Sequence, residues 1–302
     1  MSKGSGSSRR LSLSAAAKVN LALEVLSKRP DGYHEIATVM QAVDLSDRLV
    51  LEDADDVALR TGAPGVPSDE RNLAFRAAVA LRDAASVKRG VRITLDKRIP
   101  VAAGLGGGST DAAAVLVGLN RLWALRWPVA RLAELGAELG SDVPFFLYGG
   151  VAVATGRGER VEPVRGGALG LVLVNPKLAA STAEIYARVT PAMYTDGART
   201  RRVVGALRTR RAAPVAESLY NGLEAAAVTA FPQIRQMEAA LTAAGALGAM
   251  MSGSGPTVFG VARSYEHARQ IRQRLVRGSW ECWAVRSLSG PAVRFKANGS
   301  AR

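Results

Sequence analysis

Apolar and polar positions alternate between Val91 and Asp96, and this period-two pattern predicts a β-strand with one buried face. The stretch from Ala112 to Trp123 is almost continuously apolar and predicts a helix, with Ser109 or Thr110 as its N-cap. Between them lies Pro100–Asp111, which carries four glycines within the five positions 104–108. The chain is therefore expected to pass from a strand through a glycine-rich turn directly into a helix.

The same patterns predict the other elements. Strands are expected at 11–13 and 19–25, which we interpret as a first hairpin, and at 39–43, 47–52, 149–156, 169–174 and near 280–287. Helices are expected at 72–81, 129–139, 215–230, 233–244 and near 268–276. Ser181–Glu184 matches a capping box that opens a short helix with Tyr186, and the arginine-rich stretch 196–214 has little periodicity and predicts a loop.

Length and composition describe a two-domain globular chain. Its 302 residues, 48% of them hydrophobic, suffice for two domains, expected at 11–160 and 161–290. Residues 1–10 lack an apolar core and are expected to be a disordered leader rather than a secretion signal, and 291–302 a frayed tail. No apolar run of about 18 residues exists to span a membrane. The single cysteine, Cys282, indicates a reducing cytoplasm, and two histidines are too few for a histidine-rich metal site.

The net charge of +14 is the unusual feature of the composition. It allows a nucleic-acid partner, because Lys and Arg neutralise phosphates. The basic residues are nevertheless scattered in local clusters, at 199–202, 208–211 and 269–277, and do not form one stripe. We therefore favour a solvated basic surface that attracts phosphorylated substrates.

The glycine-rich segment has the character of an anion site. Glycines let the backbone turn sharply and approach a ligand, and the following helix start offers unpaired N–H groups. A Walker loop is excluded because the chain has no Gly-Lys pair, and a dinucleotide fingerprint starting at Gly104 would need glycine where Ser109 stands. A flexible surface loop is the alternative, although it would not need an N-capped helix directly behind it.

Three other positions carry candidate chemistry. Lys18 and Asn20 are polar residues in an otherwise apolar strand, although a solvated strand charge is the ordinary interpretation of such a lysine. The turn Pro30-Asp31-Gly32 presents Tyr33 and His34, which could stack on and hydrogen-bond a base or could be plain surface residues. Asp142 precedes a proline-stiffened apolar segment, where an aspartate could equally be a helix N-cap.

Three separated blocks resemble one superfamily. They are Ala17–Leu21 with Pro30–Glu35, Pro100–Thr110, and Met251–Thr257. Their order and spacing resemble the galactokinase, homoserine kinase, mevalonate kinase and phosphomevalonate kinase (GHMP) superfamily. The block Pro-Asp-Gly-Tyr-His-Glu, together with Gly140–Phe145, resembles the 4-diphosphocytidyl-2-C-methyl-D-erythritol kinase family within it. The resemblance covers roughly residues 11–290.

The resemblance implies an α+β fold of two domains, the first like domain 2 of ribosomal protein S5 and the second ferredoxin-like, with the active site between them. It implies ATP-dependent phosphorylation of the 2-hydroxyl of 4-diphosphocytidyl-2-C-methyl-D-erythritol, in the non-mevalonate isoprenoid route. Lys18 and Asp142 would be the catalytic pair, since a carboxylate can take the proton of the attacking hydroxyl while an ammonium offsets phosphoryl charge. The implied partners are ATP with Mg²⁺ and the cytidylyl substrate, with no membrane and with nucleic acid disfavoured, in a monomer or weak homodimer.

Further site residues follow from the same resemblance. Ser109 would contact Mg²⁺, and Asp111, where the family often has asparagine, could instead help hold the metal. Asn72 and Lys97 would lie near the nucleoside, and Asn20, Tyr33, His34, Thr182 and Tyr186 would bind the substrate. The ATP phosphates would be wrapped by Pro100, Val101, Ala102, Ala103, Gly104, Leu105, Gly106, Gly107, Gly108, Ser109 and Thr110.

Two alternatives remain open at this point. Another kinase of the superfamily, of the homoserine or mevalonate type, would have no use for Tyr33, His34 and Tyr186 as a base-reading set. An RNA-binding protein on an S5-like fold would use the +14 charge and would bind RNA with steep salt dependence and without ATP turnover.

Overall fold

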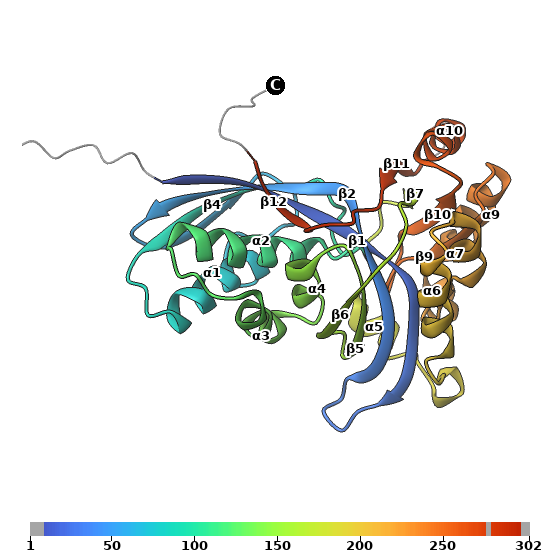
Figure 1. Cartoon of the computed structure of the whole chain (residues 1–302), viewed down its shortest axis with the longest axis horizontal. Coiled ribbons are helices and arrows are strands. Elements are labelled where there is room, and N and C mark those ends of the chain that lie inside the picture. The colour runs from blue at the N-terminus through green and yellow to red at the C-terminus, as the bar shows by residue number, and fades with distance from the viewer. Residues whose placement is uncertain (1–8, 276–278, 297–302) are drawn as a thin grey trace, which may run out of the picture.

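The computed structural model describes residues 9–275 and 279–296, and these residues form two sheets with helices packed against them (Figure 1). The larger sheet has the path β12-β1-β2-β4-β3, with β5 and β6 attached through β2 and with β8 beside β1. Its strands are β1 Arg10–Lys28, β2 His34–Ala54, β3 Val57–Thr61, β4 Gly90–Asp96, β5 Val151–Gly156, β6 Arg160–Val164, β8 Tyr220–Asn221 and β12 Val293–Lys296.

Four helices, α1 Leu73–Ala84, α2 Gly107–Leu122, α3 Val129–Leu139 and α4 Val143–Tyr148, cover this sheet. Their apolar faces and the inner face of the sheet form one buried core, to which the two alanine-rich helices α1 and α2 contribute closely packed small side chains. Small residues let the helices approach the sheet and each other, and this fixes where α2 begins relative to the end of β4.

The smaller sheet has the antiparallel order β11-β7-β10-β9. In chain order its strands are β7 Gly170–Asn175, β9 Gly248–Met251, β10 Val258–Ala262 and β11 Glu281–Arg286. Helices lie between β7 and β9 and again between β10 and β11, which gives the βαββαβ arrangement of a ferredoxin-like unit. The expected ferredoxin-like second half is therefore confirmed by its topology.

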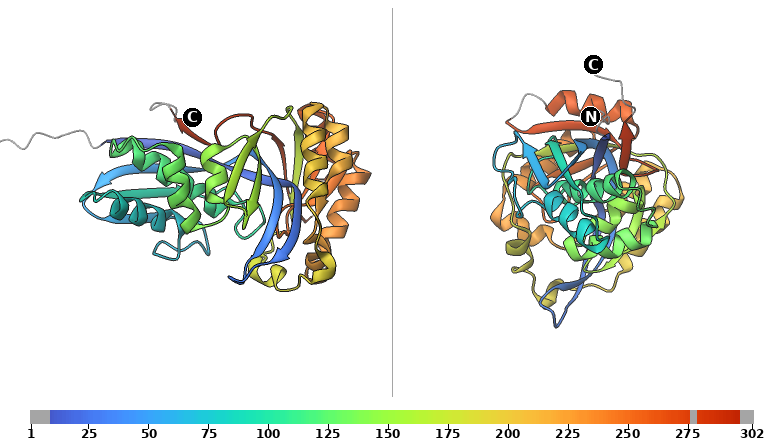
Figure 2. Two further views of the ribbon diagram at one scale, coloured as in Figure 1. Left: turned by 60° about the horizontal axis from the view of Figure 1, so that its bottom comes forward. Right: turned by 90° about the vertical axis from the view of Figure 1, so that its left-hand side faces the viewer.

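The helices of the second half are α5 Thr182–Tyr186, α6 Ala198–Arg208, α7 Ala212–Ser218, α8 Glu224–Ala230, α9 Gln233–Ala243 and α10 Tyr265–Leu275, with a short 3₁₀ helix at Pro191–Met193. Helices α6, α7, α9 and α10 lie at the opposite end of the molecule from α1 and α3 (Figure 2), whereas α5 lies near the middle, beside β5 (Figure 1). Among the residues that the structure describes, no helix is long and apolar enough to cross a membrane.

The first hairpin differs from the expectation. Residues 11–13 and 19–25 belong to one 19-residue strand, β1, and its partner is the 21-residue strand β2, which also joins the predicted strands 39–43 and 47–52. The turn lies at Pro30–Gly32, where Gly32 has a φ of +85° and Asp31 Oδ1 accepts a hydrogen bond from the Tyr33 N–H. The small alanines around Ala16 pack in the core and do not turn the chain.

The stretch 196–214 is largely helical, so the predicted loop is wrong. Helix α6 buries Thr200, Val203 and Leu207 at helical spacing, and the arginines occupy its exposed face. The N–H of its first residue, Ala198, donates to Asp196 nearby, but the next two, those of Arg199 and Thr200, donate to the carboxylate of buried Glu24 from β1. A side chain distant in sequence thus caps this helix, and local patterning could not reveal it.

Three smaller expectations are corrected. Helix α2 begins at Gly107 with Gly106 as its N-cap, so neither Ser109 nor Thr110 caps it. The predicted helix 215–230 is two helices, α7 and α8, with β8 between them. Residues 1–8 and 297–302, parts of the expected leader and tail, lie outside the described residues, but Arg10 already belongs to β1, and Val293–Lys296 pair with Ser12–Ala15 as β12 and are not frayed.

Candidate active site

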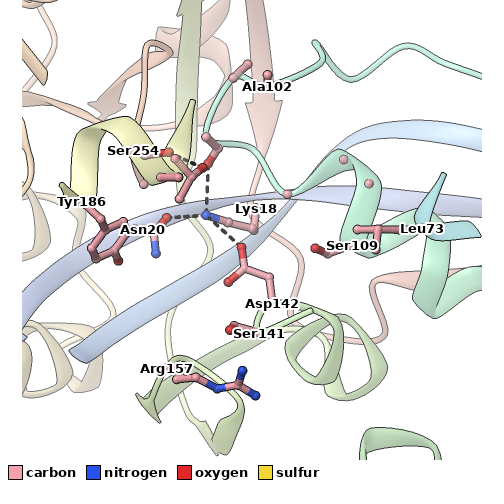
Figure 3. Close-up of a pocket in the computed structure, with 18 of the residues that line it drawn as sticks. Lys18, Asn20, Leu73, Ala102, Ser109, Ser141, Asp142, Arg157, Tyr186 and Ser254 are labelled. Carbon is pink, nitrogen blue, oxygen red and sulfur yellow. Dashed lines mark hydrogen bonds and ion pairs between the residues drawn. The ribbon is translucent and has the colours of Figure 1, made fainter. Parts of the chain in front are cut away.

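A cavity of about 1090 Å³ lies where β1, β2, the glycine-rich segment, α5 and the turn after β9 meet (Figure 3). Segments far apart in the sequence line it, from Lys18 at one end of the chain to Ser254 near the other. Of the predicted site residues, only Leu105 and Thr110 are absent from its lining, since both are buried in the interior.

Lys18 is buried in the middle of β1 and reaches into this cavity. Its Nζ donates to Asn20 Oδ1 at 2.6 Å and to the Gly104 carbonyl oxygen at 3.1 Å, and it lies 3.5 Å from Asp142 Oδ2. Burying an ammonium group is costly unless acceptors surround it, and the three groups here provide those acceptors. The interpretation of Lys18 as a solvated strand charge is therefore wrong.

Asp142 stands at the N-cap position of α4, yet its side chain makes no capping hydrogen bond. It points to Lys18 instead, and about a third of the side chain (34%) stays exposed to the cavity. A carboxylate that is fixed by an ammonium group and still open to a ligand can accept a proton from a bound hydroxyl.

The glycine-rich segment turns through three residues with positive φ, Ala102, Gly104 and Gly106. Because α2 begins at Gly107, the N–H groups of Gly107, Gly108 and Ser109 have no acceptor within the helix. They lie at the positive end of a 16-residue helix that borders the cavity. This arrangement suits a phosphate group.

The second glycine-rich turn locks the first one in place. Ser252 Oγ donates to the Gly104 carbonyl oxygen at 3.0 Å, the same oxygen that accepts from Lys18. The backbones approach so closely that a Cβ on Gly104 would come within 2.0 Å of the Ser252 carbonyl oxygen. The glycine-rich turn of Pro100–Thr110 and the turn of Met251–Thr257 therefore form one unit around Lys18.

Lys97 makes a buried ion cluster behind the start of α2. Its Nζ donates to Asp47 Oδ2 at 2.5 Å and to Asp111 Oδ2 at 2.8 Å, and Asp47 Oδ1 accepts from the Ile99 N–H at 2.8 Å. Burial opposes the charge of Lys97, but the carboxylates of Asp111 and Asp47 outweigh it and raise the Lys97 pKa. Burial raises the pKa of Asp111 well above its usual value despite Lys97. This cluster ties the end of β4 to α2.

Asn72 caps the helix beside the loop. Its Oδ1 accepts from the Ala74 N–H at 2.9 Å, and its Nδ2 donates to the Pro67 carbonyl oxygen at 2.8 Å. The residue lines the cavity, but both ends of its amide are engaged within the protein. Asn72 thus shapes the wall of the cavity next to α1.

Aromatic rings line the other end of the cavity. His34 stacks on Tyr186 with ring centroids 5.4 Å apart, which leaves no room for a third ring between them. Tyr33 is 54% exposed and lies beside Arg157, whose guanidinium group is 4.9 Å from the ring centroid. Burial, with Lys28 nearby, lowers the pKa of His34, so its imidazole is neutral at neutral pH and can donate or accept a hydrogen bond.

Thr182 joins α5 to the second glycine-rich turn, because its Oγ1 is 2.9 Å from Ser254 Oγ. Ser254, Thr38 and Arg157 line the cavity but were not predicted as site residues. Ser254 lay within the third sequence block and could have been found there. Thr38 and Arg157 are an ordinary strand residue and an ordinary loop residue, and no sequence signal marked them.

Comparison with known proteins agrees with this geometry. The family described as "GHMP kinases N terminal domain" matches residues 72–150, and "GHMP kinases C terminal" matches residues 203–281. The 4-diphosphocytidyl-2-C-methyl-D-erythritol kinase of Pelotomaculum thermopropionicum is 46% identical over 278 residues, which cover 91% of this chain and 97% of that protein. The enzyme of the same name from Gloeobacter violaceus is 47% identical and covers 86% of this chain and 88% of its own.

Solved structures give the same family and fold. A crystal structure of 4-(cytidine 5'-diphospho)-2C-methyl-D-erythritol kinase superposes with a TM-score of 0.79 at 37% identity, over 93% of this chain and 100% of that one. A homoserine kinase from Cytophaga hutchinsonii shares the fold, with a TM-score of 0.75 at 21% identity over 98% of this chain and 100% of its own. The chain thus belongs to the 4-diphosphocytidyl-2-C-methyl-D-erythritol kinase family of the GHMP kinases.

Proposed function

We propose that this chain transfers the γ-phosphoryl group of ATP to the 2-hydroxyl of 4-diphosphocytidyl-2-C-methyl-D-erythritol. The family membership and the identity to relatives of that name support the substrate. The single observation that carries the chemistry is the 3.5 Å pairing of Lys18 with Asp142, between a phosphate-type loop and an aromatic wall.

Lys18 and Asp142 are proposed as the catalytic pair. Asp142 would accept the hydrogen bond of the attacking hydroxyl and take its proton as the new bond to the γ-phosphorus forms and the bond to the departing ADP breaks. Lys18 would keep Asp142 oriented and offset the negative charge on the transferring group. Asn20 and the Gly104 carbonyl hold the ammonium at the required place, and the second of these also belongs to the phosphate loop.

The phosphates of ATP are proposed to lie on residues 100–110, against the open N–H groups at the start of α2. Pro100, Val101, Ala102, Ala103, Gly104, Gly106, Gly107, Gly108 and Ser109 line the cavity there. The N–H of Thr110 already donates to the Gly106 carbonyl oxygen and Leu105 lies in the core, so these two would support the loop from behind. Asn72 would border the nucleoside, and Lys97 would act through the packing of α2.

One side-chain oxygen of this site, the hydroxyl of Ser109, is suited to bind Mg²⁺. Magnesium in phosphoryl-transfer sites is held by a few protein oxygens together with the phosphates of the substrate. The described residues contain no group of three or more His, Cys, Asp or Glu side chains that could hold a metal ion, and Asp111 Oδ2 accepts a hydrogen bond from Lys97. Ser109, in the first turn of α2, is the residue that we propose to hold the ion with ATP, where the ion would neutralise phosphate charge.

The cytosine end of the substrate is proposed to bind at Tyr33, His34 and Tyr186. Because His34 and Tyr186 are in contact, the base would stack on Tyr33 and on the face of Tyr186 that His34 leaves free, while the neutral imidazole of His34 hydrogen-bonds its edge. Asn20 and Thr182 would contact the methylerythritol and diphosphate portion.

We also propose a cytoplasmic location, because the use of ATP and the single, buried cysteine both fit it.

The division into two units is part of the same proposal. Strand β6 pairs with β5 and therefore belongs with the first unit, which moves the expected boundary from residue 160 to the connection between Val164 and Gly170. The monomeric or weakly dimeric state stays a prediction.

The test is ATP consumption by the purified chain with Mg²⁺, comparing 4-diphosphocytidyl-2-C-methyl-D-erythritol with mevalonate and homoserine. We expect turnover with the cytidylyl compound alone, and loss of that turnover but not of ATP binding in Lys18→Met. Equal turnover with mevalonate or homoserine would overturn the substrate. Normal turnover of Lys18→Met would overturn the catalytic pair while leaving the substrate in place.

A further inference from the structure

Thr38 lies near the start of β2, next to β1, the strand that carries Lys18, and it lines the cavity although only 1% of it is exposed. It has no charge and is not among the residues assigned above. Its importance comes from the hydrogen bonds around its single hydroxyl group. These bonds connect the backbone of β1 to Asn20 and through Asn20 to Lys18.

The hydroxyl has one hydrogen, and the structure shows where that hydrogen goes. Thr38 Oγ1 donates to the Ala22 carbonyl oxygen at 2.6 Å. A carbonyl cannot donate, so the hydroxyl has no hydrogen left for another acceptor. Toward Asn20 it can only accept, and Asn20 Nδ2 donates to it at 2.8 Å.

The orientation of the Asn20 amide follows from this. With Nδ2 directed at Thr38, Oδ1 is directed at Lys18, whose Nζ donates to it at 2.6 Å (Figure 3). The reversed amide would place N–H groups against the ammonium and would leave its oxygen facing a hydroxyl without a free hydrogen. Each end of the amide is thus determined by a different neighbour.

The direction of the Thr38 hydroxyl is itself fixed by the backbone. The β1–β2 register shifts between Asn20 and Ala22, which is a β-bulge next to the site. Bulges interrupt the hydrogen-bond ladder and change the direction of nearby side chains. The Ala22 carbonyl at this bulge is bound by Thr38, so the chain of bonds starts from the main chain and is present before any ligand binds.

We propose that Thr38 is a positioning residue for phosphoryl transfer, which acts through Asn20 to hold the Lys18 ammonium against Gly104 and Asp142. This rests on the catalytic role proposed above for Lys18 and Asp142. Lys18 has three acceptors around it, and loss of the one that Thr38 orients would let the ammonium shift relative to Asp142. A small displacement of a catalytic group is costly for turnover and need not affect the binding of ATP.

The experiment compares Thr38→Val, Thr38→Ser and a matched control, Thr200→Val. Thr200 on α6 also donates its hydroxyl to a β2 carbonyl, that of Ala37 at 3.2 Å, but it does not line the cavity. We expect Thr38→Val to lower kcat roughly tenfold with the KM for ATP changed by less than about twofold. Thr38→Ser should restore most of kcat, and Thr200→Val should lower the thermal stability without lowering kcat.

A double-mutant cycle separates positioning from mere stability. If Thr38 acts through Asn20, Thr38→Val should no longer reduce kcat in an Asn20→Ala background. An undiminished effect in that background, or a Thr38→Val kcat equal to that of Thr200→Val, would overturn the inference. If Thr38→Val does not fold, Thr38→Cys takes its place, since a thiol is a poor donor and acceptor, and a normal kcat there would count equally against it.

The experiments distinguish the catalytic role of Lys18 and Asp142 from the positioning role of Thr38. Loss of turnover in Lys18→Met together with normal kcat in Thr38→Val would reject only the role of Thr38. Normal turnover in Lys18→Met would reject the catalytic pair and Thr38 with it.

Discussion

Lys18 and Asp142 both depart from the ordinary behaviour of their residue types, and these departures support the catalytic roles proposed for them. A lysine in a strand ordinarily extends to solvent, and an aspartate before a helix ordinarily caps it. Here the lysine side chain is 5% exposed and the aspartate leaves the helix uncapped in order to face it. Both departures cost stability, and such costs are typical of groups placed for chemistry.

We expect Asp142→Asn to lower turnover by several orders of magnitude, because an amide cannot take the proton of the attacking hydroxyl. The variant should still bind ATP, since the phosphate loop does not depend on Asp142. Steady-state kinetics with nucleotide binding by calorimetry would measure both. Near-normal turnover would show that Asp142 is not a base and not an essential positioning group.

Among the elements, helix α2 matters most, because its start and the preceding glycines together form the proposed phosphate site. Gly106 has a φ of +71°, and a Cβ there would lie 2.6 Å from the ring of Phe146 and 3.1 Å from Lys18 Cγ. The glycine is therefore required by the packing of α4 and of Lys18, in addition to any close approach of the phosphates.

Gly106→Val is accordingly expected to weaken ATP binding and to lower kcat, through displacement of both the loop and Lys18. The matched control is Gly205→Val in α6, where a Cβ would meet no atom within 4 Å. ATP affinity measured by calorimetry should fall only in the first variant. Unchanged affinity of Gly106→Val would mean that this segment does not cradle the nucleotide.

Helices α8 and α9 and strand β9 meet at a shared cation. Arg235 donates to Glu224 at 3.0 Å and to Glu238 at 2.9 Å, and Glu224 also accepts from the Met251 N–H. Burial, together with the neighbouring Glu224, raises the pKa of Glu238 from 4.5 to about 7. The folded chain therefore holds a proton there that the unfolded chain releases at lower pH.

The sign of the resulting pH dependence is defined. A raised acid pKa stabilises the fold fully below about pH 4.5, and this contribution is lost as the pH rises through about 7. We expect the melting temperature to fall from pH 5 to pH 8 less in Glu238→Gln than in the unmodified chain. The control is Glu266→Gln on α10, which removes the same charge from an exposed position. If the melting temperature of Glu238→Gln falls with pH as much as that of the unmodified chain, the raised pKa of Glu238 is contradicted.

At the scale of the whole molecule, the net charge of +14 is the property expected to affect how substrates approach the site. Both proposed substrates are polyanions, and a basic molecule attracts them at long range. The arginines of α6 and α10 lie on exposed helix faces of the second half and do not line the cavity, so their effect on the substrates would be general.

We therefore expect the KM for both substrates to rise roughly threefold between about 0.05 M and about 0.5 M KCl, with kcat nearly constant. Initial rates across that range would measure it, with sodium sulfate and KCl compared at equal ionic strength. RNA should bind weakly and be lost at the higher salt. Salt-resistant RNA binding together with a KM that does not respond to salt would favour the nucleic-acid alternative.

The sequence by itself determined the local elements whose cause is local. Strand β4 and helix α3 follow directly from apolar periodicity, and Ser181 caps α5 by accepting from the Glu184 N–H as its capping box predicted. The three motif blocks also indicated the family, because their spacing reflects the chemistry of the site.

Only the tertiary structure decided what depends on partners distant in the chain. The length of β1, the helix at 198–208 and the strand at 293–296 depend on β2, Glu24 and β1 respectively. The burial of Lys18, the buried cluster at Lys97 and the amide orientation set by Thr38 likewise join segments that no short window contains. Periodicity in the sequence indicates which side of an element is apolar. A buried charge or amide, by contrast, needs hydrogen-bond partners, and these come from segments that only the fold brings next to it.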